Sequence, residues 1–365
     1  MVEKRKSILW LTADYFIDVD RQLVPYLREH SEYDIRWIVI QTLNGARVCQ
    51  HDDYEILSLK YRGKDLRTYF QARSFIRTIL KEQNFDFIYA DTLGDMFYPA
   101  LLHNKGEIVL IHAAHNVIPY AGWPWDLKLL VKYIFKKCSN FQMFSQHTAK
   151  WFKEQYPDKS FFYASMVVKD FGNVKTDRYQ IDSSKVNLLF FGNIVENKRL
   201  DLLIDAIKQL PEEIQSRLHL NICGKCRLSQ EEFINKIGDY KCISTYFKRI
   251  PDEDIPELFT KHQFLMLPYQ NVAQSGPHMI AYNYNLPVIA SDISGFAERV
   301  EDGKNGYLFK QNDVEALKEA IIKAVSLNKN AYDEMKCFLK QYVDSNFTLE
   351  AVSQKYIDFF DSLKR

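Results

Sequence analysis

The segment FLMLPYQNVAQSGPHMIAYNYNLPVIASDISGFAERVEDGKNGYLF, residues 264–309, decides the fold. Its apolar runs at 264–269, 287–291 and 306–309 are short and bounded by polar turns, which is typical of buried parallel strands. A helical pattern at 277–285 lies between the first two runs. This strand–helix–strand order predicts a parallel sheet within an α/β domain.

The helix expected at 277–285 is preceded by Ser275-Gly276 and begins with Pro277. Proline favours the first helical position because its missing N–H is not needed there, and serine or glycine can occupy the cap. Such a helix start offers unpaired N–H groups and a positive dipole end, which suit a phosphate. An ordinary strand–loop–helix connection would have the same sequence, so both interpretations stay open.

A second candidate phosphate contact lies earlier in the chain. The apolar run Asn187–Gly192 ends in a glycine, which lets a ligand approach the backbone closely. Lys198 follows, just before the helical pattern Leu200–Leu210, where its ammonium could reach a diphosphate as a point charge. A solvated lysine at a helix start is the alternative.

The alternation of apolar runs and helical patterns extends through the whole chain. Because 365 residues exceed the ~250–300 that one core supports, we expect two doubly wound α/β domains, with a ligand cleft at the carboxyl ends of the strands. The polar stretch 170–184 is the predicted linker. The remaining predicted strands are 7–11, 35–40, 85–90, 108–113, 141–145, 161–167 and 218–224, and the remaining predicted helices are 21–29, 66–82, 126–138, 200–210, 254–261, 313–327 and 348–363.

Composition narrows the classes of function. The net charge of +1 argues against nucleic acid as a partner, since nucleic-acid-binding domains are normally basic. The six cysteines are scattered, as expected in a reducing compartment, and no stretch approaches the ~20 apolar residues of a membrane span. We therefore expect a cytoplasmic protein.

Several segments together resemble family 4 glycosyltransferases of the GT-B fold. In the second half the similar segments are FFGNIVENKRLDLLIDAI (190–207), YFKRIPDEDIPELFTKHQFLMLPY (246–269), LPVIASDISGFAERVEDGKNGYLF (286–309) and NFTLEAVSQKYIDFF (346–360). In the first half, IHAAHNVIPY (111–120) and FQMFSQHTAKWF (141–152) are similar to a subgroup with a His-Asn loop facing the cleft.

The resemblance implies a fold and a domain division. It implies two tandem Rossmann-like domains facing across a cleft: an acceptor-side domain at 1–172 and a nucleotide-sugar donor domain at 187–345. The C-terminal helix, 348–365, would return to the first domain.

The resemblance also implies the chemistry. A sugar would pass from a nucleotide-diphosphate donor to a glycan or lipid-linked acceptor, with retention and without a metal or other cofactor, in building a polysaccharide or glycoconjugate. The enzyme would be of the hexosyltransferase type. The site must stabilise charge on the departing phosphate, which is a preorganised electrostatic task.

The implied site residues fall into two groups. His115 and Lys198 are the candidate catalytic residues, His115 facing the sugar from the first domain and Lys198 holding the diphosphate. Gln274 would stand near the sugar. The full candidate donor-binding set is Gly192, Asn193, Gly224, Lys225, Ile250, Tyr269, Gln274, Ser275, Gly276, His278 and Glu298.

The chain departs from the family pattern at charged positions. The paired glutamates around the donor helix are absent, with Ile280 in place of the second, and the basic partner of Lys198 is missing. These losses favour a second hypothesis, a catalytically degraded transferase homologue that acts as a binding partner or scaffold. A nucleotide-sugar epimerase on the same fold is a third.

Two short motifs resemble metal sites, but they are weaker signals than the two candidate phosphate contacts. Asp18-Val19-Asp20 resembles a metal-binding DxD, although acidic residues also favour a helix N-terminus. Cys223 and Cys226 have CxxC spacing, but no second pair at zinc-site spacing follows. A non-metal role is the preferred interpretation of both motifs.

Two stretches suit peripheral contact with an anionic membrane. Residues 60–81 hold seven basic side chains and one acidic one, with aromatic residues between them. Residues 123–137 combine tryptophans with a lysine-rich amphipathic helix. Contact at the inner face of the plasma membrane is one possibility, and a solvated helix face is the alternative.

Overall fold

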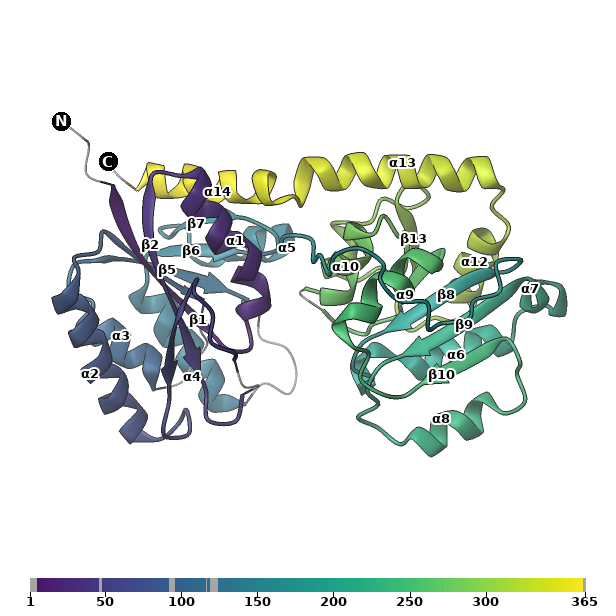
Figure 1. The fold of residues 1–365 in the computed structure, drawn as a ribbon, viewed down its shortest axis with the longest axis horizontal. Helices are drawn as coiled ribbons and strands as arrows, with labels where there is room; N and C mark the ends of the chain where they lie inside the picture. The colour runs from purple at the N-terminus through teal and green to yellow at the C-terminus, as the bar shows by residue number, and fades with distance from the viewer. Residues whose placement is uncertain are drawn as a thin grey trace. The chain divides into compact units, whose positions relative to one another are not determined.

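The computed structural model describes residues 5–45, 48–91, 96–115, 117–118, 124–272 and 274–363. The chain divides into two compact units (Figure 1). The first combines residues 1–167 with the C-terminal segment 349–365, and the second comprises residues 168–348. Each unit has its own parallel sheet.

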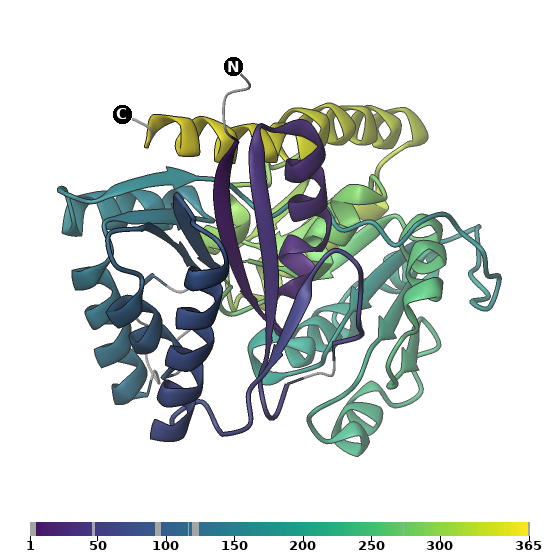
Figure 2. The ribbon, with the colours of Figure 1, turned by 60° about the vertical axis from the view of Figure 1, so that its left-hand side comes forward.

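The first unit contains a seven-stranded parallel sheet in the order β3-β2-β1-β4-β5-β6-β7 (Figure 2). Its strands are β1 Lys6–Ala13, β2 Tyr33–Gln41, β3 Glu55–Ser58, β4 Phe87–Asp91, β5 Val109–Ala114, β6 Asn140–Met143 and β7 Ser160–Tyr163. Its helices are α1 Ile17–His30, α2 Leu66–Glu82, α3 Phe97–Asn104, α4 Trp125–Lys137, α5 Gln146–Gln155 and α14 Leu349–Ser362.

Both faces of this sheet are buried, which explains the continuous apolar runs of its strands. Leu9 and Leu11 of β1 lie in a core with apolar residues of α2, α3, α4 and α5. The intervening Trp10 points to the opposite face, where its ring lies 5.8 Å from that of Tyr356 in α14. Helices therefore cover both faces of the sheet.

The C-terminal helix α14 is part of the first unit, as predicted. Tyr356 is buried, and its hydroxyl accepts a 2.6 Å hydrogen bond from Nε2 of Gln142 in β6. The ring of Phe359 stacks on that of Phe162 in β7, with 4.5 Å between centroids. Residues near the two ends of the chain thus share one core.

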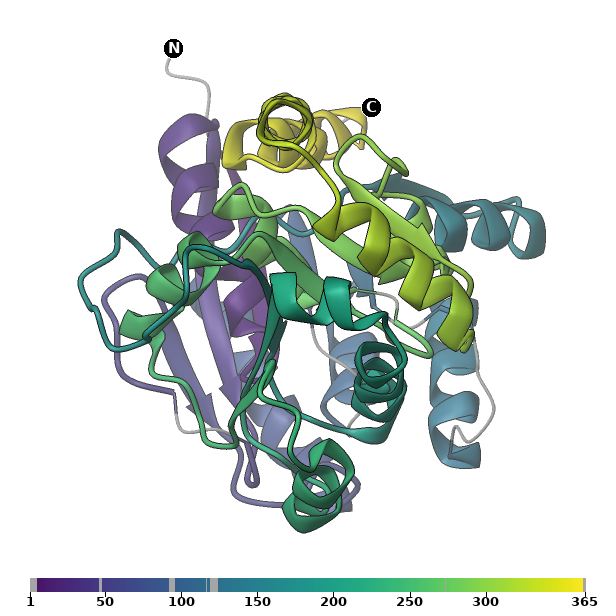
Figure 3. The ribbon, with the colours of Figure 1, turned by 90° about the vertical axis from the view of Figure 1, so that its right-hand side faces the viewer.

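The second unit contains a six-stranded parallel sheet in the order β10-β9-β8-β11-β12-β13 (Figure 3). Its strands are β8 Val186–Phe191, β9 Leu218–Cys223, β10 Ile243–Tyr246, β11 Phe264–Leu267, β12 Val288–Ser291 and β13 Gly306–Phe309. Its helices are α6 Leu200–Lys208, α7 Glu212–Arg217, α8 Gln230–Ile237, α9 Ile255–Lys261, α10 Gly276–Asn283, α11 Ser294–Ala297, α12 Val314–Val325 and α13 Lys329–Asn346, with 3₁₀ turns η1 Glu196–Lys198 and η2 Asp252–Asp254.

The expected fold class, two tandem Rossmann-like α/β units, is confirmed by these sheets. Every predicted strand is present. The structure adds strands β3 and β10 and helices α3, α5, α7, α8, α11 and α13, to which the sequence patterns assigned no element.

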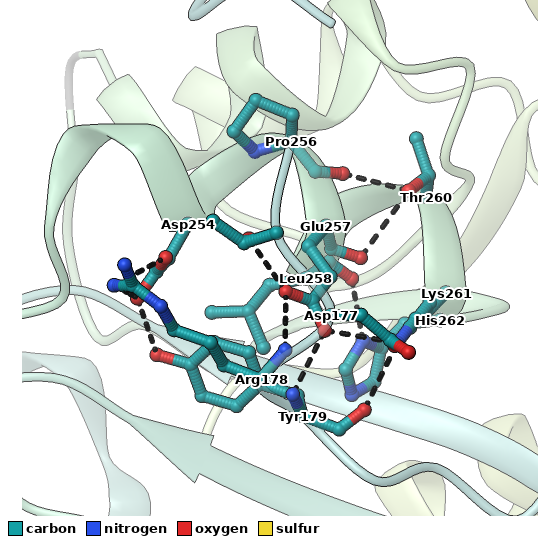
Figure 4. Close-up of polar contacts among 11 residues, drawn as sticks. Asp177, Arg178, Tyr179, Asp254, Pro256, Glu257, Leu258, Thr260, Lys261 and His262 are labelled. Atoms are coloured by element: carbon teal, nitrogen blue, oxygen red, sulfur yellow. Dashed lines mark hydrogen bonds and ion pairs between the residues drawn. The ribbon is translucent and has the colours of Figure 1, made fainter. Parts of the chain in front are cut away.

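The predicted linker, 170–184, contains no helix or strand and is bound to the second unit (Figure 4). The carboxylate of Glu257 in α9 accepts hydrogen bonds from the backbone N–H groups of Arg178 and Tyr179, at 3.0 and 2.8 Å. Nζ of Lys261 binds Asp177 at 2.5 Å. The segment is therefore an ordered strap on the second unit.

Candidate functional site

Two glycines bring the ends of β8 and β9 close together in the second unit. Gly192 has φ +102° and Gly224 has φ +148°, values that side-chain-bearing residues rarely adopt. A Cβ atom on Gly224 would lie 2.0 Å from the carbonyl oxygen of Gly192. The backbone N–H of Gly192 donates to the carbonyl of Cys223 at 2.9 Å. The ends of β8 and β9 therefore pack closely on each other and carry no side chains at these two positions.

The ammonium of Lys198 lies directly over this edge. Lys198 ends η1, and its Nζ donates to the carbonyl of Phe191 at 3.3 Å and lies 5.2 Å from the ring centroid of Tyr269. Burial lowers the pKa of Lys198 to about 8. No carboxylate of the described residues forms an ion pair with it. A partly buried cation without a counter-charge favours binding of an anion, because the anion offsets the cost of burying the charge.

The start of α10 meets the same edge. Ser275 caps the helix, its hydroxyl oxygen accepting from the N–H of His278 at 3.3 Å, and the first turn contains no acidic residue. A Cβ atom on Gly192 would lie 2.9 Å from Nζ of Lys198 and 3.5 Å from Cγ of Pro277. The strand end, the lysine and the helix start therefore converge around Gly192.

Two hydrogen bonds, one between backbone groups and one from a side chain, hold the two loops of this cluster together. The N–H of Gln270 donates to the carbonyl of Asn197 at 2.7 Å, and Nδ2 of Asn197 donates to the carbonyl of Asn271 at 3.4 Å. The turn that presents Lys198 is thus tied to the loop that leads into α10.

Three other predicted residues lie around the start of α10 and the loop that precedes it. Gln274 is partly buried, and its Nε2 has no hydrogen-bond partner within the described part of the chain. His278 is 1% exposed; burial, and then the charge of Arg299, lowers its pKa well below the usual range, so the ring is neutral. The carboxylate of Glu298 forms a 2.6 Å ion pair with Arg299.

The remaining predictions on this unit are more scattered. Asn193 and Lys225 are exposed in the loops that follow β8 and β9. Ile250 is 5% exposed in the segment after β10, so its side chain is a core group in this structure. Tyr269 is buried beside Lys198 and next to Ser275.

His115 lies in the first unit, at the carboxyl end of β5. Its Nε2 is 2.6 Å from Oδ1 of Asp91, the last residue of β4. The neighbouring Asn116 lies outside the described residues. Asp91 was not among the residues predicted from the sequence, although a polar residue that ends a buried strand is a signal that could have identified it.

A second residue that the sequence analysis missed is Lys169. Its Nζ lies 3.7 Å from the position of a Cβ atom on Gly276, and its backbone N–H donates to the carbonyl of Met279 at 3.3 Å. Lys169 therefore adds positive charge where the basic partner of Lys198 is lacking.

The two metal-like motifs have structural roles in this fold. Asp20 is buried, and its Oδ2 accepts from Nε1 of Trp10 at 2.9 Å and from Oγ1 of Thr12 at 2.5 Å. Cys223 is buried at the end of β9, and burial raises the pKa of its thiol to about 12. The described residues contain no cluster of three or more His, Cys, Asp or Glu side chains that could hold a metal ion.

Comparison with known proteins gives consistent matches. Residues 174–337 match the family model described as glycosyl transferases group 1. An uncharacterized glycosyltransferase of Methanocaldococcus jannaschii is 24% identical, over 93% of this chain and 88% of that protein.

Solved structures share the whole fold. Anabaena HepE in complex with UDP superposes with a TM-score of 0.75 at 15% identity, covering 98% of this chain and 100% of that one. A glycosyltransferase from Rickettsia africae superposes with a TM-score of 0.78 at 16% identity, covering 99% of both chains.

Proposed function

We propose, on the premise that these likenesses support a glycosyltransferase of the GT-B fold, that the chain transfers a sugar from a nucleotide-diphosphate donor. The acceptor is a glycan or a lipid-linked glycan precursor. The transfer retains the anomeric configuration, is of the hexosyltransferase type, and needs no metal or other cofactor.

The convergence of Lys198, Gly192 and the start of α10 carries this proposal. A diphosphate placed there meets an ammonium without a carboxylate partner in the described residues, glycine backbone at the strand end and the positive end of a helix dipole. These groups stabilise negative charge in the ground state and, more strongly, on the leaving nucleoside diphosphate. HepE, a structural neighbour, has been crystallised with UDP and with UDP-glucose, which supports a uridine diphosphate donor.

A donor screen tests the proposal. The full chain is titrated calorimetrically with UDP-, GDP- and dTDP-sugars, and binding of at least one is expected. With a glycan or lipid-phosphate acceptor, NMR of the product gives the anomeric configuration, and turnover unchanged by EDTA is expected. If no donor binds, the result would support the scaffold hypothesis. The apolar side chain of Ile280 in α10 also favours that hypothesis, because it has no carboxylate that could bind a ribose. Conversion of donor without acceptor would indicate an epimerase.

We expect Lys169→Ala to weaken donor binding about tenfold, because a charge-assisted contact to phosphate contributes roughly 1.5 kcal/mol. Lys175→Ala, which removes an exposed lysine from the adjacent strap, is the matched control and should leave the dissociation constant unchanged. Equal affinities of the two variants, measured by calorimetry, would remove Lys169 from the phosphate site.

Membrane contact by the first unit is a further part of the proposal. Leu66 and Phe70 of α2 are 59% and 55% exposed, and Trp125 and Leu129 of α4 are 75% and 58% exposed. Lys64, next to the start of α2, forms an ion pair with Asp126 of α4, which links the two helix starts. Trp123 lies outside the described residues.

A hollow beside α4 strengthens this assignment. It has a volume of about 380 Å³ and is bounded by apolar side chains of α4 and α5 together with basic groups. Its lining residues are Val117, Lys128, Leu129, Val131, Lys132, Phe135, Trp151, Gln155 and Tyr156. Apolar groups among lysines suit the interface of an anionic lipid bilayer. In the described ranges no helix is both long and apolar enough to cross a bilayer.

We expect the double variant Trp125→Ser/Leu129→Ser to reduce binding to vesicles that contain phosphatidylserine about tenfold or more, because two exposed apolar anchors are lost. Co-sedimentation measures the effect, with phosphatidylcholine vesicles as the uncharged reference. Leu228→Ser, at an exposed leucine of the second unit, is the matched control. Sedimentation of the double variant equal to that of the unsubstituted chain would place the membrane contact elsewhere.

A further inference from the structure

A buried carboxylate holds one nitrogen of the His115 ring. Nε2 of His115 lies 2.6 Å from Oδ1 of Asp91, and Asp91 has no exposed surface. Asp91 is the last residue of β4 and pairs in register with Thr12 of β1, so its backbone is fixed by the sheet. The carboxylate is acceptor-only when ionised, so Nε2 must carry the proton of this hydrogen bond.

Two aromatic rings fix the plane of the imidazole. Phe16, which precedes α1, stacks on His115 with 3.8 Å between centroids and 12° between planes. Phe144, which follows β6, stacks with 4.2 Å and 19°. Stacked neighbours and a hydrogen bond along the ring edge together remove both the tilt and the rotation of the ring.

The other ring nitrogen is the one available to a ligand. Nδ1 of His115 has no hydrogen-bond partner in the described part of the chain. His115 as a whole is 8% exposed. Nδ1 is therefore the ring nitrogen without a partner among the described residues.

Several other titratable groups lie near Asp91 and the ring, and those described here are buried. Burial, and then the charge of Asp91, raises the pKa of Asp20 well above its usual range. Burial lowers the pKa of His112 to about 3, so that ring is neutral. Burial raises the pKa of both Tyr89 and Tyr356, which are therefore also uncharged.

We propose that Asp91 is a positioning residue that keeps the proton of neutral His115 on Nε2, so that Nδ1 acts as a hydrogen-bond acceptor for a substrate hydroxyl group. This inference rests on the proposed function, because a sugar offers hydroxyl donors. In this tautomer Nδ1 pairs with a hydroxyl group and repels an anionic phosphate oxygen. Substrate orientation is thereby set by a carboxylate that does not touch the substrate.

The first test is the tautomer itself, which does not depend on activity. The full chain is labelled with ¹⁵N-histidine, and the His115 signals are identified by their loss in His115→Gln. Above the titration of the ring, a protonated Nε2 and an unprotonated Nδ1 are expected. In Asp91→Asn the amide can either accept from or donate to Nε2, so a mixed or reversed tautomer is expected. An Nδ1-protonated ring in the unsubstituted chain, or an unchanged tautomer in Asp91→Asn, would overturn the proposal.

The second test is kinetic and uses the donor found in the screen. Asp91→Asn should lower kcat about tenfold or more and alter the pH profile of kcat, because a ring in the wrong tautomer cannot accept the hydroxyl proton. Asp158→Asn, at an exposed position in the turn before β7, is the control and should leave both unchanged. A tautomer shift in Asp91→Asn with kcat and the pH profile unchanged would show that the pair has only a structural role. Lack of turnover in the unsubstituted chain would contradict the proposed function and leave the tautomer result standing.

Discussion

Replacing Lys198 by alanine is expected to lower sugar transfer about 10²–10³-fold, the range seen when one preorganised group that stabilises transition-state charge is removed. The ammonium lies 2.9 Å from the position of a Cβ atom on Gly192 and pairs with no carboxylate in the described ranges, so its charge is available to a ligand. The loss should fall mainly on kcat, because charge on the leaving diphosphate is greatest in the transition state. Initial rates at several donor concentrations measure it.

The control is Lys323→Ala, which removes an exposed lysine from α12 of the same unit and should keep full activity. Circular dichroism should show both variants folded. Turnover and donor affinity of Lys198→Ala equal to those of the control would exclude Lys198 from the phosphate site.

The same residue predicts a pH dependence of donor binding. Burial lowers the pKa of Lys198 in the free protein to about 8, so the side chain is charged below this pH and loses its proton above it. A bound diphosphate favours the charged form. Donor affinity should therefore be flat below pH 8 and fall as the pH rises beyond it. Calorimetry between pH 7 and pH 10 checks this, and Lys198→Ala should lack the high-pH decrease.

Replacing Glu257 by glutamine is expected to reduce the free energy of unfolding of the second unit by about 3 kcal/mol, since it breaks a buried, hydrogen-bonded charge pair. The carboxylate is fully buried and accepts from Oγ1 of Thr176 at 2.6 Å and from Nζ of Lys261 at 2.9 Å, besides the two backbone N–H groups of the strap. Burial alone would raise its pKa, but these donors outweigh burial and lower the pKa of Glu257 to about 2. Urea unfolding measures the loss.

The control for this variant is Glu253→Gln, which removes a carboxylate of η2 that is 57% exposed and lies 3.6 Å from Arg178. A change within about 0.5 kcal/mol is expected there. Because the pKa of Glu257 is depressed, its stabilisation is present above the unfolded-state pKa of ~4.3 and is lost as the pH falls toward 2. Glu257→Gln should flatten this acid dependence, and identical acid profiles would contradict the assignment.

The sequence predicted the core strands well because both faces of each sheet are covered, which makes buried strands nearly continuous apolar runs. The missed strands β3 and β10 lie at sheet edges, where most of their side chains are partly exposed and the run is broken. Helix α13 was missed for a similar reason, since only Met335, Leu339 and Val343 along its 18 residues are buried.

The candidate site was predictable where it depends on local backbone signals and not where it depends on distant contacts. Gly192, Lys198 and the α10 cap could be found because strand ends, glycines and helix caps have local sequence patterns. Asp91 lies 24 residues from the ring it holds, and Lys169 lies more than 100 residues from Gly276. Pairings across such separations are set by sheet order, which a single sequence does not display.

The first unit is built from two segments that lie far apart in the chain, and this has a consequence for its biosynthesis. Its core needs Tyr356 and Phe359 of α14, which a ribosome synthesises after the whole second unit. At ~5–20 residues per second the second unit has time to fold while Trp10 and Phe162 still lack their covering helix. The N-terminal sheet, although made first, is therefore the later of the two to be completed. A nascent chain halted near residue 348 would expose aromatic surface that chaperones recognise.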